Sequence, residues 1–158
     1  MNIPSPIAIK PRALRRGDTI GVIAPASNLK AEMLEDGLRE LHALGFKTRV
    51  GEGILELDRY TAGSVTRRAQ ELRSMLLDDS VSAIFCARGG YGSGHLLPLI
   101  DESEIRSNPK ILCGSSDVTL LLAAFQKAGV VGFHGPMVAT TLRQGDGAYD
   151  RGLLIRML

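Results

Sequence analysis

The chain has 158 residues, enough for one buried core, and its 44% hydrophobic and 23% charged residues are ordinary for a globular domain. Its net charge of +2 and its low aromatic content of 4% give no support for nucleic-acid binding. No apolar run approaches the roughly 18 residues of a membrane span. The start, Met-Asn-Ile-Pro-Ser-Pro, lacks the profile of a secretory signal, so we expect a cytoplasmic protein without a membrane partner.

Apolar runs alternate with segments of helical spacing. After an irregular lead-in (residues 1–18), we expect buried strands at residues 19–24, 46–50 and 81–87, from residue 111, and at 130–133. The intervening helices carry apolar residues at helical spacing, namely Leu34, Leu38 and Leu41, then Val65, Ala69, Leu72 and Leu76, and then the residues that lead to Gly129. Residues 25–28 offer a cap to the first helix and Ser64 offers one to the second.

This alternation predicts an α/β fold with an open, mostly parallel sheet and helices on both faces, of the flavodoxin-like kind. Ligands of such sheets bind beyond the carboxyl ends of the strands. Four short loops, at residues 25–28, 88–94, 114–117 and 134–137, all fall at that edge. Cys86 and Cys113 lie within predicted strands, and no spacing of ligating residues indicates a metal.

The strand from residue 111 runs into Gly114-Ser115-Ser116-Asp117 and then into a helix. A sharp strand-to-helix turn exposes its central hydroxyl near the positive end of the helix, which makes Ser116 the candidate nucleophile. The alternative is that Ser115, Ser116 and Asp117 only cap the helix. A serine nucleophile also needs a base and a group that orients it. His134, at the end of a strand beside the expected pocket, is the candidate base in this chain, whereas His42 is expected at the surface and His95 lines the pocket or begins a helix.

Residues 88–94 form a loop too rich in glycine for the interior of an element. Its free backbone N–H groups suit a phosphate or an oxyanion, and a tight turn between strand and helix is the structural alternative. The loop is neither a Walker motif nor a G-x-G-x-x-G fingerprint in register, so it is only a weak signal for nucleotide binding.

Taken together, residues 14–27, 83–92, 114–119 and 134–137 resemble the serine LD-carboxypeptidases, the muramoyltetrapeptide carboxypeptidase family that includes the microcin C immunity peptidase. The resemblance implies that Ser116 is the nucleophile and that the backbone N–H groups of Asp117 and Gly90 form the oxyanion hole. Around them, the substrate pocket would include Arg88, Gly89, Tyr91, Ser115 and His134. Family members cleave the bond before a terminal D-alanine in murein tetrapeptides, use no cofactor and commonly form homodimers.

In this family the catalytic histidine and the glutamate that orients it come from a carboxy-terminal domain that the 158 residues do not include. We therefore expect residues 1–143 to be the nucleophile-bearing domain, and residues 144–158 to be a linker and the start of a helix leading onward. The chain alone should be inactive or nearly so and should expose an apolar surface. The alternatives are a microcin C immunity-type amide hydrolase of the same family, a nucleotide- or phosphate-binding module, and a non-catalytic interaction domain.

Overall fold

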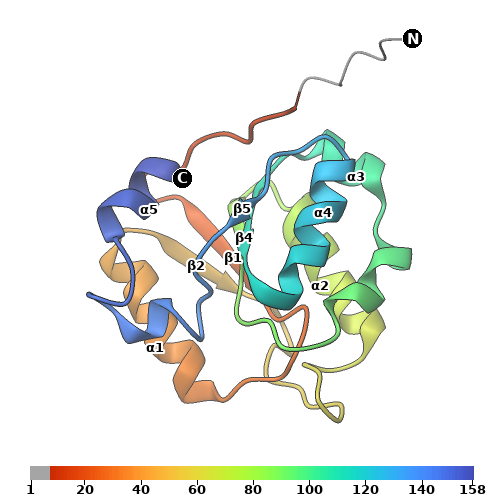
Figure 1. Cartoon of the computed structure of the whole chain (residues 1–158), viewed down its shortest axis with the longest axis horizontal. Helices are drawn as coiled ribbons and strands as arrows, with labels where there is room; N and C mark the ends of the chain where they lie inside the picture. Colours follow the sequence, from red (N-terminus) through yellow and green to blue (C-terminus); the bar gives the residue numbers. More distant parts are fainter. Residues whose placement is uncertain (1–7) are drawn as a thin grey trace.

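A computed structural model describes residues 8–158 of the chain (Figure 1). Its centre is a five-stranded sheet with the order β2-β1-β3-β4-β5, in which every neighbouring pair of strands is parallel. The strands are β1 (Thr19–Ile23), β2 (Lys47–Val50), β3 (Val81–Cys86), β4 (Ile111–Gly114) and β5 (Phe133–His134). This is the flavodoxin-like strand order, so the predicted fold class is confirmed.

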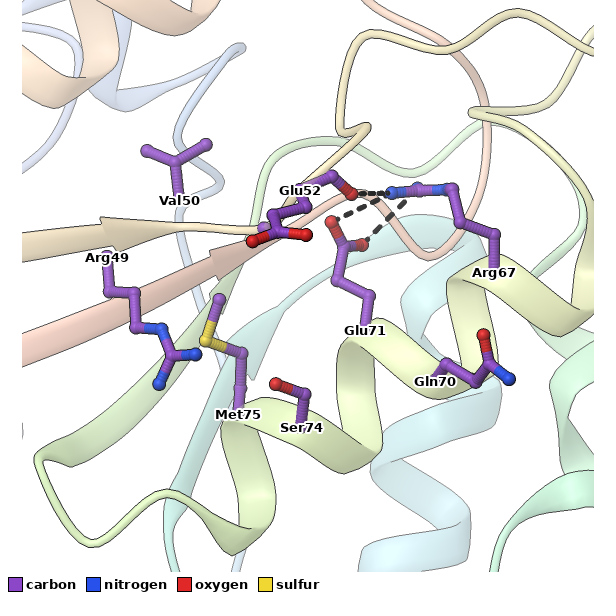
Figure 2. Close-up of a pocket in the computed structure, with 9 residues that line it drawn as sticks. Arg49, Val50, Glu52, Arg67, Gln70, Glu71, Ser74 and Met75 are labelled. Atoms are coloured by element: carbon purple, nitrogen blue, oxygen red, sulfur yellow. Dashed lines mark hydrogen bonds and ion pairs between the residues drawn. The ribbon is translucent and has the colours of Figure 1, made fainter.

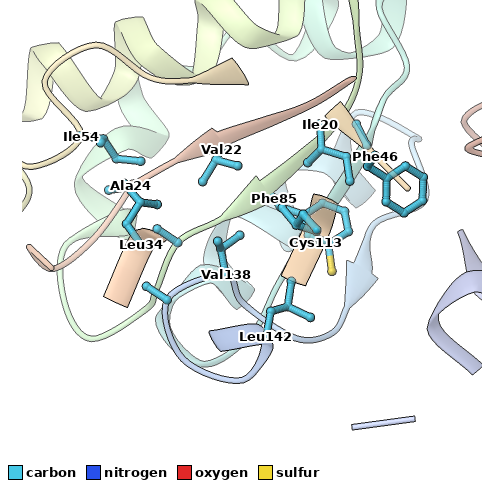
Figure 3. Close-up of a cluster of buried hydrophobic side chains, with 14 of the residues drawn as sticks. Ile20, Val22, Ala24, Leu34, Phe46, Ile54, Phe85, Cys113, Val138 and Leu142 are labelled. Carbon is cyan, nitrogen blue, oxygen red and sulfur yellow. The ribbon is translucent and has the colours of Figure 1, made fainter. Parts of the chain in front are cut away.

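Helices connect the strands and cover both faces of the sheet (Figure 1). They are α1 (Ala31–Ala43), α2 (Val65–Leu77), α3 (Glu102–Ser107), α4 (Thr119–Lys127) and α5 (Arg151–Met157), with shorter 3₁₀ helices η1 (Ser93–Leu99), η2 (Ser116–Val118) and η3 (Leu142–Gln144). Because side chains alternate along a strand, the three inner strands β1, β3 and β4 contribute to two hydrophobic clusters, one on each face of the sheet. One cluster joins Ile20, Val22, Phe85 and Cys113 to α1 and η3 (Figure 3). Helix α5 contributes Leu154 to the same cluster.

The opposite cluster joins the alternate strand residues to α2, α3 and α4. Ile84 and Leu112 point to this side and pack with Leu72, Leu121 and Phe125. The two thiols divide between the faces, and burial raises the pKa of Cys86 well above its ordinary value and that of Cys113 to about 12. Both cysteines are free and stay protonated at neutral pH.

Some boundaries differ from the sequence-based expectation. The last strand occupies Phe133–His134 rather than residues 130–133. Val130 instead forms an isolated parallel bridge with Ile9, in the segment before β1. There the Ile9 N–H donates to the Gly129 carbonyl at 2.7 Å, and Val131 donates to Ile9 at 3.0 Å. The rest of the predicted lead-in, residues 1–7, lies outside the described residues.

The helix caps also differ in part. Ser64 caps α2 as predicted, since its side chain accepts from the Arg67 N–H at 3.2 Å. Helix α1 instead begins after Lys30, without a cap from residues 25–28. Asn28 donates its N–H to the Tyr60 carbonyl at 3.2 Å, so this segment is tied to the loop before α2.

The tail packs against the same domain. Asp150 caps α5 by accepting from the Leu153 N–H at 2.8 Å, while Leu154 and Leu158 are buried in the cluster on the α1 side. The carboxylate of Glu40 on α1 accepts bonds from Tyr149 and, at 2.7 Å, from both the Nε and Nη2 atoms of Arg151. No helix within residues 8–158 is long and apolar enough to cross a membrane.

Candidate active site

The serine turn leaves the carboxyl end of β4. Ser115 is extended, Ser116 has a φ of 58°, and η2 and α4 follow at once. A positive φ is uncommon for a residue with a side chain and marks a constrained turn. Gly114 makes the turn possible, because a Cβ there would lie 2.6 Å from the Cγ1 of Val118. The chain therefore exposes Ser116 at the edge of the sheet, close to the start of a helix.

The capping alternative receives no support from this geometry. Ser115 makes no capping bond with its side chain, and the Asp117 carboxylate accepts from the Ser93 N–H at 2.8 Å instead of from its own helix. In the part of the chain that the structure describes, no hydrogen bond occupies the hydroxyl of Ser116. This hydroxyl is thus free to face a ligand.

The glycine loop lies directly against the serine turn. A Cβ built on Gly89 would stand 3.1 Å from the Cβ of Ser116 and 3.3 Å from the amide nitrogen of Asp117. Gly90 has a φ of +100°, and its Cβ would stand 2.3 Å from the Oγ of Ser27. The positive φ and the short contact with Ser27 both require glycine at position 90, whereas a side chain at position 89 would require the serine turn to shift by a few tenths of an ångström. The backbone of the loop and the N–H of Asp117 consequently share one small region.

Two further serines hold this arrangement, and neither was identified as a site residue from the sequence. Ser93 is fully buried and donates its hydroxyl to the Asp117 carbonyl at 2.6 Å. Ser27 accepts from the Tyr91 N–H at 3.1 Å and donates its own N–H to the Gly89 carbonyl at 3.2 Å. Ser27 lies in residues 25–28 and Ser93 lies in residues 88–94, two of the loops expected at the carboxyl edge of the sheet. That position is the sequence signal by which they could have been identified.

Arg68 is the largest side chain buried beside these loops, with only 1% of the residue exposed. Its guanidinium donates to the carbonyls of Pro25 at 2.6 Å, Gly92 at 2.8 Å and Gly63 at 3.3 Å. Burial lowers its pKa from the ordinary value. Nothing in the sequence indicated this, since a pair of arginines in an amphipathic helix is ordinarily solvated.

Arg88 and Tyr91 border the loop. Arg88 donates to the Asn28 carbonyl at 3.0 Å, and its buried Nε has no partner within the described residues. Its Nη2 lies 3.7 Å from the Cβ position of Gly90. Tyr91 is exposed and meets the ring of His95 edge-on, with 5.2 Å between the centroids. Tyr91 and His95, together with Tyr60 and Arg68, line an open hollow of about 470 Å³.

His134 ends β5 and pairs in register with Gly114 of β4. Its ring is exposed and makes no hydrogen bond to Ser116 within the described part of the chain. His134 therefore lies on the strand next to the serine turn without forming a nucleophile–base pair. Residues 8–158 also contain no group of three or more His, Cys, Asp or Glu side chains that could hold a metal ion.

A separate pocket of about 330 Å³ lies between β2 and α2 (Figure 2). Inside it, the buried Glu71 carboxylate accepts from Arg67 at 3.0 Å (Figure 2). The same carboxylate accepts from the Ala24 N–H at 3.0 Å. Burial raises the pKa of Glu71 despite the nearby Arg67. The lining includes neither Ser116 nor the glycine loop, so this pocket is not the candidate site. Glu71 instead holds the backbone at Ala24, directly after β1.

An exposed serine in a constrained strand-to-helix turn, facing a second loop of free backbone N–H groups, is the arrangement of serine hydrolases with an α/β fold. Comparison with known proteins identifies the family. Residues 20–135 match the family described as the LD-carboxypeptidase N-terminal domain. The chain belongs to this family.

Among curated proteins, the chain is 44% identical over 138 residues to a probable murein peptide carboxypeptidase of Bacillus subtilis, covering 87% of this chain and 43% of that protein. It is 39% identical over 124 residues to a murein tetrapeptide carboxypeptidase of Pseudomonas aeruginosa, covering 78% and 40%. The chain thus spans about two fifths of the length of these relatives.

Solved structures show the same relationship. An MccF-like protein from Bacillus anthracis superposes with a TM-score of 0.83 at 35% identity, covering 89% of this chain and 44% of the other. A structure of MccF in complex with glutamyl sulfamoyl guanosine superposes with a TM-score of 0.82 at 31% identity, covering 90% and 43%.

Proposed function

We propose that the chain is the nucleophile-bearing domain of a serine LD-carboxypeptidase that hydrolyses the bond before a terminal D-alanine in murein tetrapeptides. The main support is the constrained turn at Ser116, an exposed residue, with Gly89 packed against both the Cβ of Ser116 and the amide nitrogen of Asp117. The two murein peptide carboxypeptidases at 44% and 39% identity support the substrate class.

In this proposal the Oγ of Ser116 attacks the carbonyl carbon of the scissile amide while a base removes the hydroxyl proton. The backbone N–H groups of Gly90 and Asp117 stabilise the negative charge that develops on the carbonyl oxygen. The amine of D-alanine leaves with a proton from the same base, and water then hydrolyses the ester on Ser116. In this proposal the substrate lies among Arg88, Gly89, Tyr91, Ser115 and His134, and the Arg88 guanidinium beside Gly90 suits the terminal carboxylate of the peptide.

The base and the group that orients it belong, in this proposal, to a carboxy-terminal domain of the kind present in the longer relatives. Residues 1–143 are then the catalytic half, and residues 144–158 lead toward the second domain. The proposal includes a cytoplasmic location and a homodimeric full-length protein, and it requires no cofactor.

A microcin C immunity-type amide hydrolase is the second candidate. It is supported by the 36% identity over 135 residues to the self-immunity protein MccF of Escherichia coli. The identity to the two murein enzymes, 44% and 39%, is higher, and this supports the murein peptide as the first candidate substrate. A phosphate-binding or non-catalytic module is less well supported, because the glycine loop packs on the serine turn and the serine hydroxyl is free.

Labelling with a fluorophosphonate tests the proposed nucleophile. We would treat the chain, its Ser116→Ala variant and the matched Ser115→Ala variant with the probe, and locate the adduct by mass spectrometry. Each sample would be measured alone and with the separately produced carboxy-terminal part of the Bacillus subtilis relative. We expect an adduct on Ser116 in the chain and in Ser115→Ala, forming faster in the mixture, and none in Ser116→Ala.

An unlabelled Ser116 in a mixture that demonstrably forms a complex would refute the nucleophile assignment. With a labelled, active mixture, the substrate follows from comparing D-alanine release from a murein tetrapeptide with cleavage of an aminoacyl sulfamoyl adenosine. Faster turnover of the sulfamoyl compound would favour the immunity-type hydrolase.

A further inference from the structure

Arg68 joins three separate segments of backbone around the candidate oxyanion hole. Its Nη1 donates to Pro25, which follows β1, and to Gly92 in the glycine loop, while its Nε donates to Gly63 before α2. Pro25 lies two residues before Ser27 and Gly92 lies two residues after Gly90. One guanidinium therefore holds both the glycine loop, which carries the proposed oxyanion donor Gly90, and the loop after β1, in which Ser27 contacts the glycine loop.

The partners of Arg68 are unusual for a buried cation. Among residues 8–158 no carboxylate lies within ion-pairing distance of its guanidinium. Asp117, Asp58 and Glu71 act on it at longer range, opposed by the like charge of Arg67. Burying a guanidinium without a paired anion is unfavourable, and a well-packed apolar residue would satisfy the interior at less cost. Unlike an apolar side chain, the guanidinium forms hydrogen bonds to three backbone carbonyls.

Two serine contacts carry this restraint from Arg68 to the reacting groups. Ser27 holds the backbone next to Gly90 through the Tyr91 N–H, at 3.1 Å. Ser93, the residue after Gly92, holds the Asp117 carbonyl at 2.6 Å. A shift of the loop at Gly92 would consequently move both proposed oxyanion donors relative to Ser116.

We propose that Arg68 is a positioning residue of the oxyanion hole, which acts by the fork geometry of its guanidinium and not by its charge alone. This inference rests on the proposed function of Ser116. A lysine at this position keeps the charge, but its single ammonium group lacks the planar fork that reaches carbonyls of separate segments.

The test measures the rate of Ser116 phosphonylation in Arg68→Ala, Arg68→Lys and a control, Leu72→Ala. Leu72 is buried on the same helix and has no hydrogen-bonding group, so its loss destabilises α2 without touching the carbonyl network. We expect Arg68→Ala to react about 100-fold more slowly than the parent chain, as for a displaced oxyanion donor. Arg68→Lys should remain slow, and Leu72→Ala should react at the parent rate while folded.

Chemical rescue separates positioning from stability. Arg68 lines the open hollow beside Tyr91 and His95, so a small cation has a route to the vacated site in Arg68→Ala. Millimolar guanidinium should restore the rate of Arg68→Ala and leave Arg68→Lys and Leu72→Ala unchanged. If Arg68→Ala does not fold, the rate of Arg68→Lys decides the question.

A parent-like rate in folded Arg68→Lys, or in Arg68→Ala without guanidinium, would overturn the inference while leaving the nucleophile assignment intact. If Ser116 of the parent chain stays unlabelled even in a complex with the carboxy-terminal part of the relative, the proposed function fails, and backbone hydrogen exchange of residues 88–94 then tests the restraint separately. Unchanged exchange there in both Arg68 variants would overturn the inference on structural grounds.

Discussion

Gly90 has little conformational freedom, because two independent constraints act on it. Its φ of +100° disfavours any residue with a side chain, and the Cβ of such a residue would meet the Oγ of Ser27 at 2.3 Å. Gly90→Ala should therefore displace the loop and slow the phosphonylation of Ser116 by about 100-fold, the loss expected for one oxyanion donor. The rate of adduct formation, measured by intact mass, checks this.

Gly17→Ala is the matched control for the cost of placing a residue with a side chain at a positive φ. Gly17 has a similar φ of +88°, but nothing lies within 4 Å of its Cβ position. It should lose about 1 kcal/mol of stability and label at the parent rate. Equal labelling rates for Gly90→Ala and Gly17→Ala would show that the close approach to Ser27 has no catalytic consequence.

At the scale of single residues, the sequence predicted that the glycine loop and the serine turn would lie at the same edge of the sheet, because a strand-to-helix turn and a glycine run each have a local signature. The supporting contacts of Arg68 and Ser93 had no such signature. Burial of an arginine depends on three carbonyls contributed by segments 5 to 43 residues away, and local spacing cannot report that.

At the scale of elements, period and turn residues predicted five strands and their alternation with helices. The misplaced strand was β5, where pairing of Ile9 with Val130 uses the lead-in, a segment without a periodic pattern. Ser64 as a cap was predictable because its signal lies within one turn of the helix. The start of α1 was not predictable in this way, because the Asn28 N–H donates a hydrogen bond to the carbonyl of Tyr60, 32 residues further along the chain.

Helix α5 should detach from the domain in acid. The bonds from Arg151, together with Tyr149, hold the pKa of the buried Glu40 carboxyl below its ordinary value of 4.5. A carboxyl whose folded pKa is lowered contributes stability above its unfolded pKa and loses it as the pH falls through the folded value. Proteolysis after residues 144–147 by an acid-active protease should therefore accelerate below about pH 4 before the rest of the chain unfolds.

Glu40→Gln should show the same accelerated cleavage at neutral pH, since it removes the charge that pairs with Arg151. Glu104→Gln is the control, because that residue forms an exposed ion pair with Arg73 on the other face of the sheet. Cleavage of Glu40→Gln at the parental rate at neutral pH would mean that apolar packing of Leu154 and Leu158 alone holds the tail.

At the scale of the whole molecule, the tail leaves an apolar surface uncovered. Leu153, Ile155 and Met157 are 44–54% exposed, although Leu154 of the same helix is buried. Leu153 and Met157 border a groove of about 190 Å³ together with Phe133. A second domain that supplies the base would gain contact area at this surface.

The double variant Leu153→Glu, Met157→Glu should consequently fold like the parent chain but lose the faster Ser116 labelling that the carboxy-terminal part of the relative provides. Leu99→Glu, at an equally exposed position on the opposite face, should keep the faster labelling. Circular dichroism with labelling rates, each measured with and without the added part, checks the prediction. Undiminished enhancement in the double variant would place the docking surface elsewhere.

The strand order also sets how long the candidate site persists. The loops that carry Ser27, Gly90 and Ser116 leave β1, β3 and β4, the three strands with a neighbour on each side. Backbone amides of such inner strands exchange with solvent mainly when the whole domain unfolds. In the proposed function, the segments that carry the nucleophile and the oxyanion donors are thus anchored to strands that stay paired for as long as the domain is folded. Binding of a domain that supplies the base would then require no refolding of the sheet that carries them.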